Sequence, residues 1–582
     1  MIFKKNIKRI VVINNIKYLN VYEKKYRSSG DVIFCIHPLI KRACEERKFH
    51  HVQKVDVVEE ENFQLFKKLQ YEIIDKTILN LDKYSRKKTK EKKLEIGTYF
   101  SFQLWVLIGQ ALNCVLTIKS LTETLNCSNY LIFEKRFAKN FLLYRPDPEC
   151  VFSETANSEY FTDRINVKII KINNKSNNFI SSLNLKDIIP DNFKNIIRYL
   201  KLKYNFYNKK NSDAKKLLLI GGIFDWGEIG KYDTFRKIFQ IDLILPFFKF
   251  NFLQIDENIN EILKSDISID SKEIFPLNKL SKFISRDLHY YEKQHDKIHN
   301  KIKYFTAGIS SVLTFPDDHF LAHMVYKTKK PFVIWQHGEK GQSDDPTIPY
   351  TELTYATNYL SFGKKVTDEY SFIKREYKLK NVNTVGSLSK NIKNLDRRYI
   401  LYATGKWHSC AAPISALDAD ARLLNVQRKL LSFFESISEC KKVIFKLNNT
   451  RCLNQNVDMP NKVIVENKKS FTELLSNAAC VVLDTPATTL LESVSTELPI
   501  FVVGGRADYR SDFLKVVKKR VVWEDDVDNL IFKLDQYLKS NLYQSDCFNS
   551  EFRDNYCSKI PAEEVVMNVK NALNNAINEN RY

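Results

Sequence analysis

Short runs of apolar, mostly β-branched residues alternate along the chain with longer stretches whose apolar residues recur at helical spacing. Such alternation is typical of parallel β-sheets whose crossover helices cover both faces. In the first half, the pattern predicts strands at residues 31–36, 130–133, 167–172, 216–220, 250–255, 304–307, 331–336, 359–362 and 383–385, with helices at 319–326 and from residue 366.

A second series of the same kind follows a charged link at residues 390–398. It has about the size of one nucleotide-binding domain. We therefore predict an α/β protein with two Rossmann-like domains facing across a cleft and an elaborated N-terminal region, divided into residues 1–390, residues 391–560 and a C-terminal helix or tail at 561–582. The second series predicts strands at 399–403, 442–447, 462–466, 480–483, 499–503 and 521–523, and helices at 417–437, 470–478, 488–495 and 527–539.

The composition fits a large folded protein. Of 582 residues, 44% are hydrophobic, which excludes a disordered chain or a disulfide-held mini-domain. Lysine and arginine number 91 against 69 acidic residues, and the net charge of +22 attracts polyanions such as nucleic acid, anionic lipid headgroups or acidic saccharides. The lysine-rich stretches at 86–93 and 201–216 lack the interleaved aromatic residues that are typical of a nucleic-acid-binding module. We interpret them as solvated faces and expect no specific nucleic-acid partner.

The cysteine pattern and the N-terminus concern the cellular compartment. Eleven cysteines are scattered singly, without a C-x-x-C pair, which indicates a reducing compartment and argues against structural zinc. The apolar stretch of the N-terminus is brief and is broken by Asn14, Asn15 and Lys17, unlike that of a signal peptide. We therefore expect a cytoplasmic protein.

Residues 96–118 carry no charge and are long enough as a helix to cross a bilayer. Gln103, Gln110 and Asn113 interrupt the stretch, and each would be costly in lipid. The flanking lysines show no asymmetry that would set an orientation. The pattern favours a buried helix of a large domain over a membrane-associated helix.

The segment at 481–492 carries the most specific chemistry. An apolar run ends at Asp484, a turn with hydroxyl side chains follows, and a helical pattern begins. Free amides at a helix start favour an anion, to which Thr485, Thr488 and Thr489 can add hydroxyl donors, and Glu492 one turn further can accept hydrogen bonds from ribose. The alternative is an ordinary helix N-cap by Asp484 or Thr485.

This segment resembles the D-x-x-x-T-T-x-x-E turn, followed by a proline-led strand, of GT-B-fold glycosyltransferases. It is most similar to bacterial surface-carbohydrate and CDP-glycerol-type polymer transferases, and the likeness extends over residues 215–540. The resemblance implies that the turn binds the donor's phosphates and that the helix carboxylate binds its ribose. It also implies catalysis without a metal ion or a resident cofactor, with a nucleotide sugar as co-substrate.

Three further stretches agree with this family order. His337 ends an apolar run in Gln-His-Gly, similar to the family element whose histidine implies a general base or a phosphate contact near the acceptor. The alternative is a histidine that caps a loop, because Glu339 and Lys340 follow where small residues are expected. A Val-Gly-Ser turn at 385–387 resembles the one before the interdomain crossing. Lys446 and Arg451 stand where relatives carry K-x-H-P, and their charges suit donor phosphates. The missing His-Pro pair argues against a CMP-sialic-acid donor.

Other candidates follow glycines or stand near each other in sequence. Asp225 and Glu228 come after a Gly-Gly pair and are reserve candidates for the base, with a structural turn as the alternative. Thr404 and Lys406 resemble a loop that approaches a donor phosphate. The P-loop pattern is not met. Two groups of residues resemble metal ligands: Asp317, Asp318 and His319 form one, and His295 and His299 form the other. Neither group has a further ligand at a recognisable spacing, so we predict no metal site.

These observations predict a metal-independent GT-B-type glycosyltransferase that uses a nucleotide-activated sugar to extend a cell-surface polysaccharide or lipid-linked glycan. Residues 1–390 would hold the acceptor and residues 391–560 the donor. An anionic membrane surface is a further expected partner, at the inner face of the cytoplasmic membrane. The alternatives are a CDP-glycerol-type polyol-phosphate transferase, a nucleotide-sugar 2-epimerase and a non-enzymatic polyanion-binding protein.

Overall fold

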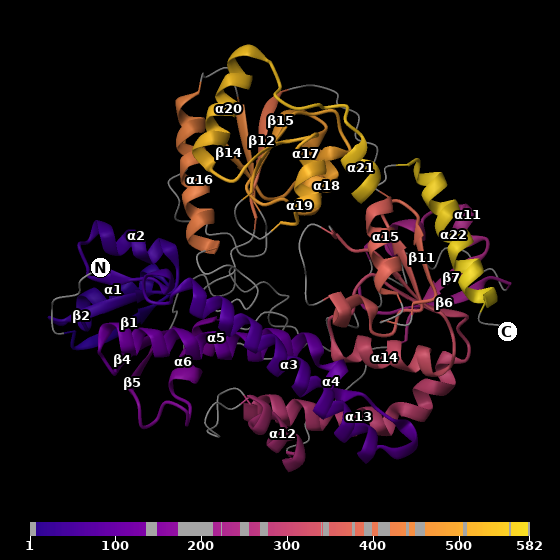
Figure 1. Cartoon of the computed structure of the whole chain (residues 1–582), viewed down its shortest axis with the longest axis horizontal. Coiled ribbons are helices and arrows are strands. Elements are labelled where there is room, and N and C mark those ends of the chain that lie inside the picture. The colour runs from indigo at the N-terminus through magenta and orange to yellow at the C-terminus, as the bar shows by residue number, and fades with distance from the viewer. Residues whose placement is uncertain are drawn as a thin grey trace.

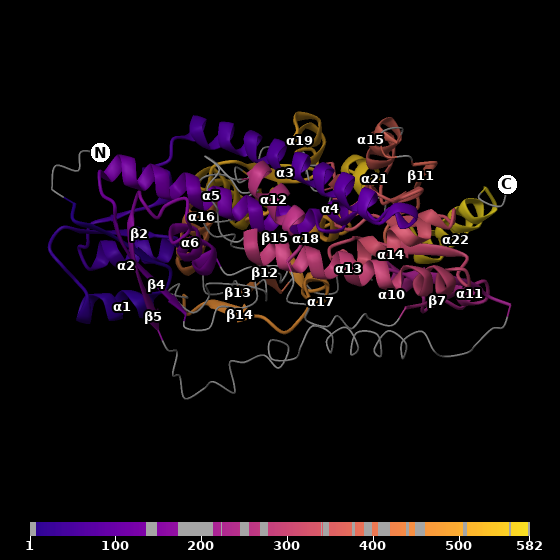
Figure 2. The same ribbon diagram turned by 90° about the horizontal axis from the view of Figure 1, so that it is seen from below.

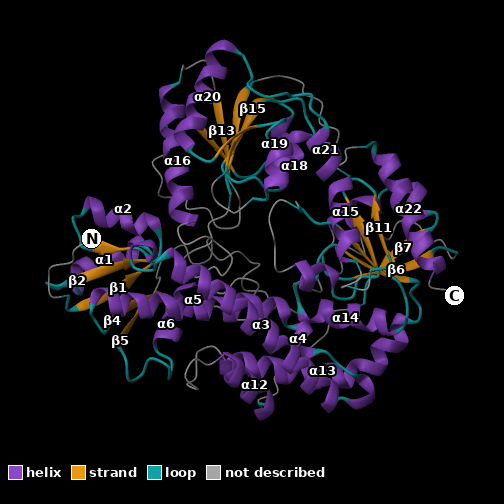
Figure 3. Cartoon of the chain, viewed as in Figure 1, coloured by secondary structure: helices purple, strands orange, loops and turns teal. Residues whose placement is uncertain are grey.

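The computed structural model contains three parallel β-sheets arranged around a helical bridge (Figures 1 and 3). We refer to them in chain order as sheets A, B and C. The structure describes residues 7–135, 148–172, 213–222, 224–244, 255–267, 277–338, 340–341, 348–374, 377, 379–388, 398–405, 419–437, 442–447, 460–504, 509–557 and 560–579.

Sheet C has the strand order β14-β13-β12-β15-β16-β17, and every pairing is parallel. The chain starts at β12, moves outward to one side and then returns to the other side. This doubly wound order creates a switch point between β12 and β15, where the loops after the two strands diverge. The strands are β12 (Tyr399–Ala403), β13 (Lys442–Lys446), β14 (Val463–Glu466), β15 (Ala478–Leu483), β16 (Ile500–Val503) and β17 (Val522–Glu524).

The helices of this unit cover both faces of sheet C (Figure 3). The helices are α16 (Ala419–Ser436), α17 (Phe471–Leu475), α18 (Thr488–Val494), α19 (Ser511–Val517) and α20 (Val527–Ser540). Apolar residues of α16 and α20 form a separate core cluster with the strands on one face, whereas those of α17, α18 and α19 belong to the main core.

Sheet B is also parallel and has the order β11-β10-β9-β8-β6-β7. Its switch point lies between β6 and β8. Its strands are β6 (Lys215–Leu219), β7 (Phe239–Asp242), β8 (Ala307–Ser310), β9 (Phe332–Trp335), β10 (Asn358–Ser361) and β11 (Asn381–Thr384). Its helical segments include α10 (Phe224–Ile229), α11 (Asp233–Arg236), the π-helical η4 (Pro349–Leu353) and α15 (Lys364–Ile373).

The elaborated N-terminal region contains a sheet of its own, which sequence reasoning did not separate. Sheet A has the order β3-β2-β1-β4-β5, again all parallel. Its elements are β1 (Arg9–Ile13), α1 (Ile16–Lys25), β2 (Asp31–Cys35), α2 (Pro38–Glu46), β3 (His51–Val52), η1 (Lys54–Asp56), β4 (Asn129–Lys135), α6 (Pro148–Ala156) and β5 (Asn166–Ile172).

A layer of long helices joins sheet A to sheet B along one side of the molecule (Figure 1). It consists of α3 (Glu60–Lys88), η2 (Lys90–Lys92), α4 (Ile96–Tyr99), α5 (Ser101–Leu125), α12 (Glu257–Ile267), α13 (Leu277–Ile302) and α14 (Pro316–Lys327). By length and composition α5 could span a membrane, and 78% of its most apolar window is buried inside the protein. Its packing against α3 and α6 is that of a core helix.

The end of the chain returns to sheet B. After α21 (Glu551–Tyr556), which packs on α15 and α18, α22 (Ala562–Glu579) lies against β10, β11 and α11. The backbone of Asn555 approaches Gly363 so closely that an added Cβ would lie 2.2 Å from the Asn555 carbonyl oxygen. The sheet C unit is therefore tied to sheet B by its own C-terminal segment.

Most predicted elements form within one or two residues of their expected bounds, and the two predicted Rossmann-like units are sheets B and C. The division at residue 390 stays a prediction. The strand predicted at 304–307 is shifted, because α13 continues to residue 302, Tyr304 is 77% exposed in the turn, and β8 begins at residue 307. Residues 250–254 of another predicted strand lie outside the described residues. The prediction omitted β1, β3 and β7.

The contact between α3 and α4 predicts a stability effect. A Cβ added to Gly97 would lie 2.1 Å from the backbone oxygen of Ile78, so Gly97→Ala must displace one helix. We expect a loss of about 1–3 kcal/mol in unfolding free energy, measured by chemical denaturation. Ser101→Ala in the same layer is the control, since it removes a buried hydroxyl that makes no hydrogen bond and should be neutral or stabilising. Equal stability of Gly97→Ala and wild type would contradict the packing described for these helices.

Candidate functional site

A buried carboxylate organises the switch point of sheet C. Asp484, 2% exposed, directly follows β15. Its Oδ2 accepts a hydrogen bond from the Tyr402 hydroxyl at 2.6 Å, and its Oδ1 accepts one from the Gly405 amide at 2.6 Å. Gln427 of α16 donates to Thr404 Oγ1 and lies 3.5 Å from Asp484 Oδ2. Asp484 therefore holds the loops after β12 and β15 together.

The predicted helix start lies where expected, but its cap differs from the alternative considered above. Ala487 is the N-cap residue of α18 and makes no side-chain cap hydrogen bond. Asp484 is occupied by the neighbouring loop, and the Thr485 hydroxyl donates to the carbonyl of Asp484 at 2.8 Å. Thr488 is exposed and Thr489 is half-buried. An ordinary side-chain N-cap by Asp484 or Thr485 is thus not formed.

Glu492 lies one turn into α18 and is half-buried. Its Oε2 accepts a hydrogen bond from the Thr472 hydroxyl of α17 at 2.9 Å. Burial raises the pKa of this carboxyl, and the Thr472 hydrogen bond partly offsets the shift. The pair fixes the carboxylate at the side of the helix, and the predicted ribose contact stays a prediction.

His337 lies on a glycine turn after β9. Gln336, fully buried, uses its side-chain amide to donate to the carbonyl of Gly338 at 3.0 Å, and its Oε1 accepts from the Phe362 amide at 2.8 Å. Gly338 has φ +69°, a conformation that residues with a Cβ rarely adopt. Gln336 and Gly338 therefore set the position of the half-buried His337 at the carboxyl edge of sheet B.

The two predicted halves of the site meet across the sheets. A Cβ built on Gly338 would lie 3.5 Å from Thr488 Oγ1, so the turn after β9 lies next to the start of α18. These residues are 150 positions apart in the sequence. The carboxyl edge of sheet B thus faces the carboxyl edge of sheet C at His337 and Thr488, as the prediction of two facing domains requires.

The loop after Gly338 has a buried ionic anchor. Lys340 Nζ lies 2.7 Å from Glu352 Oε1, and the two side chains are 11% and 1% exposed. The Tyr359 hydroxyl donates to Glu352 Oε2 at 2.7 Å. A buried ion pair with a second hydrogen bond fixes geometry more than it adds stability. The sequence did not predict that Lys340 is an anchor. Its partner Glu352 lies on a π-helical turn, and the spacing of apolar residues does not predict such a turn.

Asp225 and Glu228 lie near the switch point of sheet B and differ in environment. Asp225 is half-buried, and desolvation, followed by the charge of Glu228, raises its pKa to about 7. The neighbouring Trp226 packs edge-to-face on Trp335, with ring centroids 5.2 Å apart. Trp335 precedes His337 by two residues in the sequence. Glu228 is exposed and pairs with Lys231 at 2.7 Å, so it belongs to the solvated surface.

Two of the remaining predicted donor residues, Thr404 and Lys446, are among the residues that the structure describes. Thr404 is half-buried beside Asp484, and its amide donates to the carbonyl of Lys446 at 3.3 Å. Lys446 ends β13 and is half-buried. Lys406 and Arg451 lie outside the described residues. The structure thus brings Thr404, Lys446 and the threonines after β15 to one edge of sheet C.

No group of three or more histidine, cysteine or acidic side chains is placed to hold a metal ion within the part of the chain that the structure describes. His319 is fully buried in α14, and burial lowers its pKa to about 3. His295 stacks on His299 along α13, with ring centroids 6.1 Å apart. Metal independence of the reaction stays a prediction.

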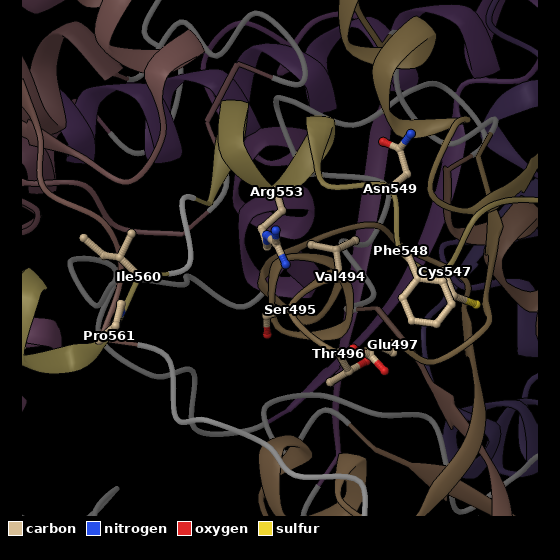
Figure 4. A pocket seen from close by; sticks show the side chains of 10 residues that line it. All are labelled: Val494, Ser495, Thr496, Glu497, Cys547, Phe548, Asn549, Arg553, Ile560 and Pro561. Carbon is tan, nitrogen blue, oxygen red and sulfur yellow. The ribbon is translucent and has the colours of Figure 1, made fainter.

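A cavity of about 350 Å³ lies at the opposite end of α18 (Figure 4). The Arg553 side chain points there toward the end of this helix. The threonines at the start of α18 do not line the cavity, so it is distinct from the predicted donor site. It is lined by Val494, Ser495, Thr496, Glu497, Cys547, Phe548, Asn549, Arg553, Ile560 and Pro561.

Comparison with known proteins gives a family. The family model described as LIC12162 family transferase matches residues 149–509, more than half of the chain. The match includes both the turn after β9 and the start of α18. No curated protein is similar to the sequence at a significant level.

Among solved structures, similar chains include three proteins, of which one, SnogD, is described as a glycosyltransferase. A TarM mutant from S. aureus, in complex with fondaparinux, α-GlcNAc-glycerol and UDP, is 10% identical over 52% of this chain and 61% of its own, with a TM-score of 0.34. HepE from Anabaena with UDP and glucose is 9% identical over 62% and 99%, with a TM-score of 0.38. SnogD from Streptomyces nogalater is 9% identical over 62% and 99%, with a TM-score of 0.33. The chain thus spans less than two thirds of TarM.

The Asp484 cluster predicts a stability effect. Asp484→Ala would leave the Tyr402 hydroxyl and the Gly405 amide without their acceptor, at a cost of about 1–3 kcal/mol for each buried group. We expect chemical denaturation to show a loss within that range or above it. The control is Asp528→Ala, which removes a surface partner of Lys429 and should change stability by less than about 1 kcal/mol. A loss no larger than that of the control would refute the anchoring role.

Proposed function

This chain belongs to the LIC12162 family of transferases, and from that premise we propose that it transfers a sugar from a nucleotide-activated donor to a hydroxyl of a growing surface glycan. The observation that carries the proposal is the close approach of the Gly338 turn to Thr488. It joins a histidine on one sheet edge to a cluster of hydroxyl and amide donors on the other. A transfer reaction needs these two kinds of group at one place.

The edge of sheet C suits the donor. Open parallel sheets bind ligands outside the carboxyl ends of their strands at the switch point. There, the hydroxyls of Thr488 and Thr489 can donate to phosphate oxygens, while Thr404 and Thr485 lie at the same edge and Lys446 adds positive charge nearby. These groups stabilise a nucleoside diphosphate as it accumulates charge on leaving the sugar.

The edge of sheet B suits the acceptor. A neutral imidazole at His337 accepts the proton of the acceptor hydroxyl as its oxygen forms the bond to the anomeric carbon. The bond from that carbon to the phosphate oxygen breaks, and the nucleoside diphosphate leaves with the electron pair. His337 then returns the proton to solvent. Gln336 and the anchored Lys340 keep the histidine in place during this step.

We further propose that the enzyme works in the cytoplasm beside the membrane. The described cysteines are free thiols, the form expected in a reducing compartment. A lipid-linked acceptor would be reached at the inner surface of the cytoplasmic membrane. The polyol-phosphate transferase and the epimerase remain as outcomes of the donor screen below, and the polyanion-binding protein would show steep salt-dependent nucleic-acid binding instead.

The donor edge is tested by ligand-induced stabilisation. A panel of CMP, CDP, UDP, GDP and their sugar conjugates should contain one that raises the melting temperature by about 2–4 °C at saturating concentration. Thr488→Ala should remove most of this shift, since it deletes a donor at the start of α18. Thr496→Ala, at the other end of the helix beside the cavity of Figure 4, should retain it. No stabilisation by any nucleotide, or loss only in Thr496→Ala, would overturn the proposed donor edge.

The identity of the base is tested by the pH profile of transfer. If His337 is the base, His337→Ala should lower kcat by about 10²–10⁴-fold, while Asp225→Asn leaves most of it. If Asp225 is the base, the rate should rise as pH increases through about 7, where its carboxyl loses its proton, and Asp225→Asn should abolish that rise. Initial rates with the donor found above, measured between pH 5 and 9, distinguish the two roles.

A further inference from the structure

One face of α3 points away from the protein along its whole length. In Figure 2 the helix runs along the outer side of the molecule. Exposed residues recur at every third or fourth position of the helix and so form one face, while the opposite face packs on α4, α5 and α12. We name this face the α3 stripe; it consists of Leu65, Lys68, Leu69, Glu72, Lys76, Leu79, Lys83, Arg86 and Lys87.

The stripe carries large apolar side chains that the fold leaves in water. Leu65 is 69% exposed, Leu69 is 46% exposed and Leu79 is 59% exposed. A folded protein exposes single leucines commonly, but three on one line of one helix form a linear feature. The core of the protein does not need them, because Phe63, Ile74 and other residues of the opposite face fill that role.

The same face is strongly basic. Five cationic side chains share it with Glu72, and the exposed carboxylates of Glu61 and Asp75 lie at its start and along its edge. Lys76 pairs with Asp266 at 3.3 Å, and Arg86 pairs with Glu95 at 2.6 Å. Lys68, Lys83 and Lys87 make no ion pair with any described residue, so their charge is left for an external anion.

We propose that the α3 stripe docks the protein on an anionic phospholipid bilayer. The helix would lie in the plane of the interface, with the three leucines among the upper acyl carbons. The lysine stems would extend upward so that their ammonium groups meet the lipid phosphates. The inference goes beyond the proposed transfer reaction, which concerns the facing edges of sheets B and C, and it would stand if that reaction were wrong.

A second copy of the chain is the other occupant to consider. A helix-to-helix seam needs an apolar residue at nearly every third or fourth position. Along the α3 stripe, Glu72, Lys76, Lys83 and Arg86 occupy the positions between and after the leucines. Desolvating these charges in a protein interface is costly, whereas a lipid headgroup layer accommodates lysines beside leucines. The spacing therefore favours the membrane.

Vesicle sedimentation of the full-length protein tests this assignment. We expect binding to vesicles of phosphatidylcholine with about one third phosphatidylglycerol, and much weaker binding to phosphatidylcholine alone. Replacing Lys68, Lys83 and Lys87 with glutamine should lower the partition coefficient about fivefold per lysine. This factor corresponds to about 1 kcal/mol of attraction between one basic side chain and an anionic membrane surface. Leu65→Ser with Leu79→Ser should remove the part of the binding that persists at high salt.

The matched control removes the same charge from another helix of the N-terminal region. Lys17, Lys24 and Lys25 of α1 are exposed, and their replacement with glutamine should leave vesicle binding within about twofold of wild type, because charge at a distance is screened. Equal losses in the two lysine variants would overturn the proposal in favour of a general effect of net charge. A wild-type dimer in sedimentation velocity that the leucine variant dissociates, with no vesicle binding, would assign the stripe to a second copy.

Discussion

The absence of a side chain at position 338 is the constraint on which the rest of the site depends. The turn after β9 has a left-handed backbone at Gly338 and lies next to Thr488 on the facing unit. A residue with a Cβ would be strained in this backbone conformation. The buried side chain of Gln336 holds this turn from behind by joining it to the backbone after β10. The placement of His337 thus follows from packing and backbone conformation.

The matching constraint on the other unit is the buried carboxylate of Asp484. It binds the loop after β12 and lies directly before the threonine turn. The two sheets are kept face to face by the C-terminal segment, whose backbone at Asn555 packs on Gly363 and whose last helix covers sheet B. Each half of the site is therefore held by its own buried hydrogen bonds, and the chain end connects the two halves.

Much of this arrangement follows from local sequence. Alternating apolar runs predict sheets B and C, because buried parallel strands read as continuous hydrophobic segments. The Gln-His-Gly and threonine motifs stand at strand ends, which places them at carboxyl edges before any coordinates are known. The family match confirms a transferase. Local sequence therefore predicts where the strands end and which residues follow them.

The remainder depends on contacts between distant segments. β1 has only four apolar residues after Arg9, and it becomes a central strand only because β2 and β4 pair with it. Asp484 resembles a ligand-binding acid in its motif, yet it is buried by Tyr402, which is 82 positions away. Glu228 has a partner three residues on and lies in water, which spacing alone does not distinguish from a buried base. Periodicity likewise marks α3 as amphipathic but does not show which face the protein covers.

Hydrogen–deuterium exchange in the presence of a tightly bound nucleotide or nucleotide sugar measures directly whether the two sheet edges form one site. Slower exchange is expected both in the turn at residues 336–338 and in the segment at 484–490, because one ligand contacts both edges. Protection of neither segment, or protection only around residues 494–497 and 547–553 that line the cavity at the far end of α18, would contradict the account.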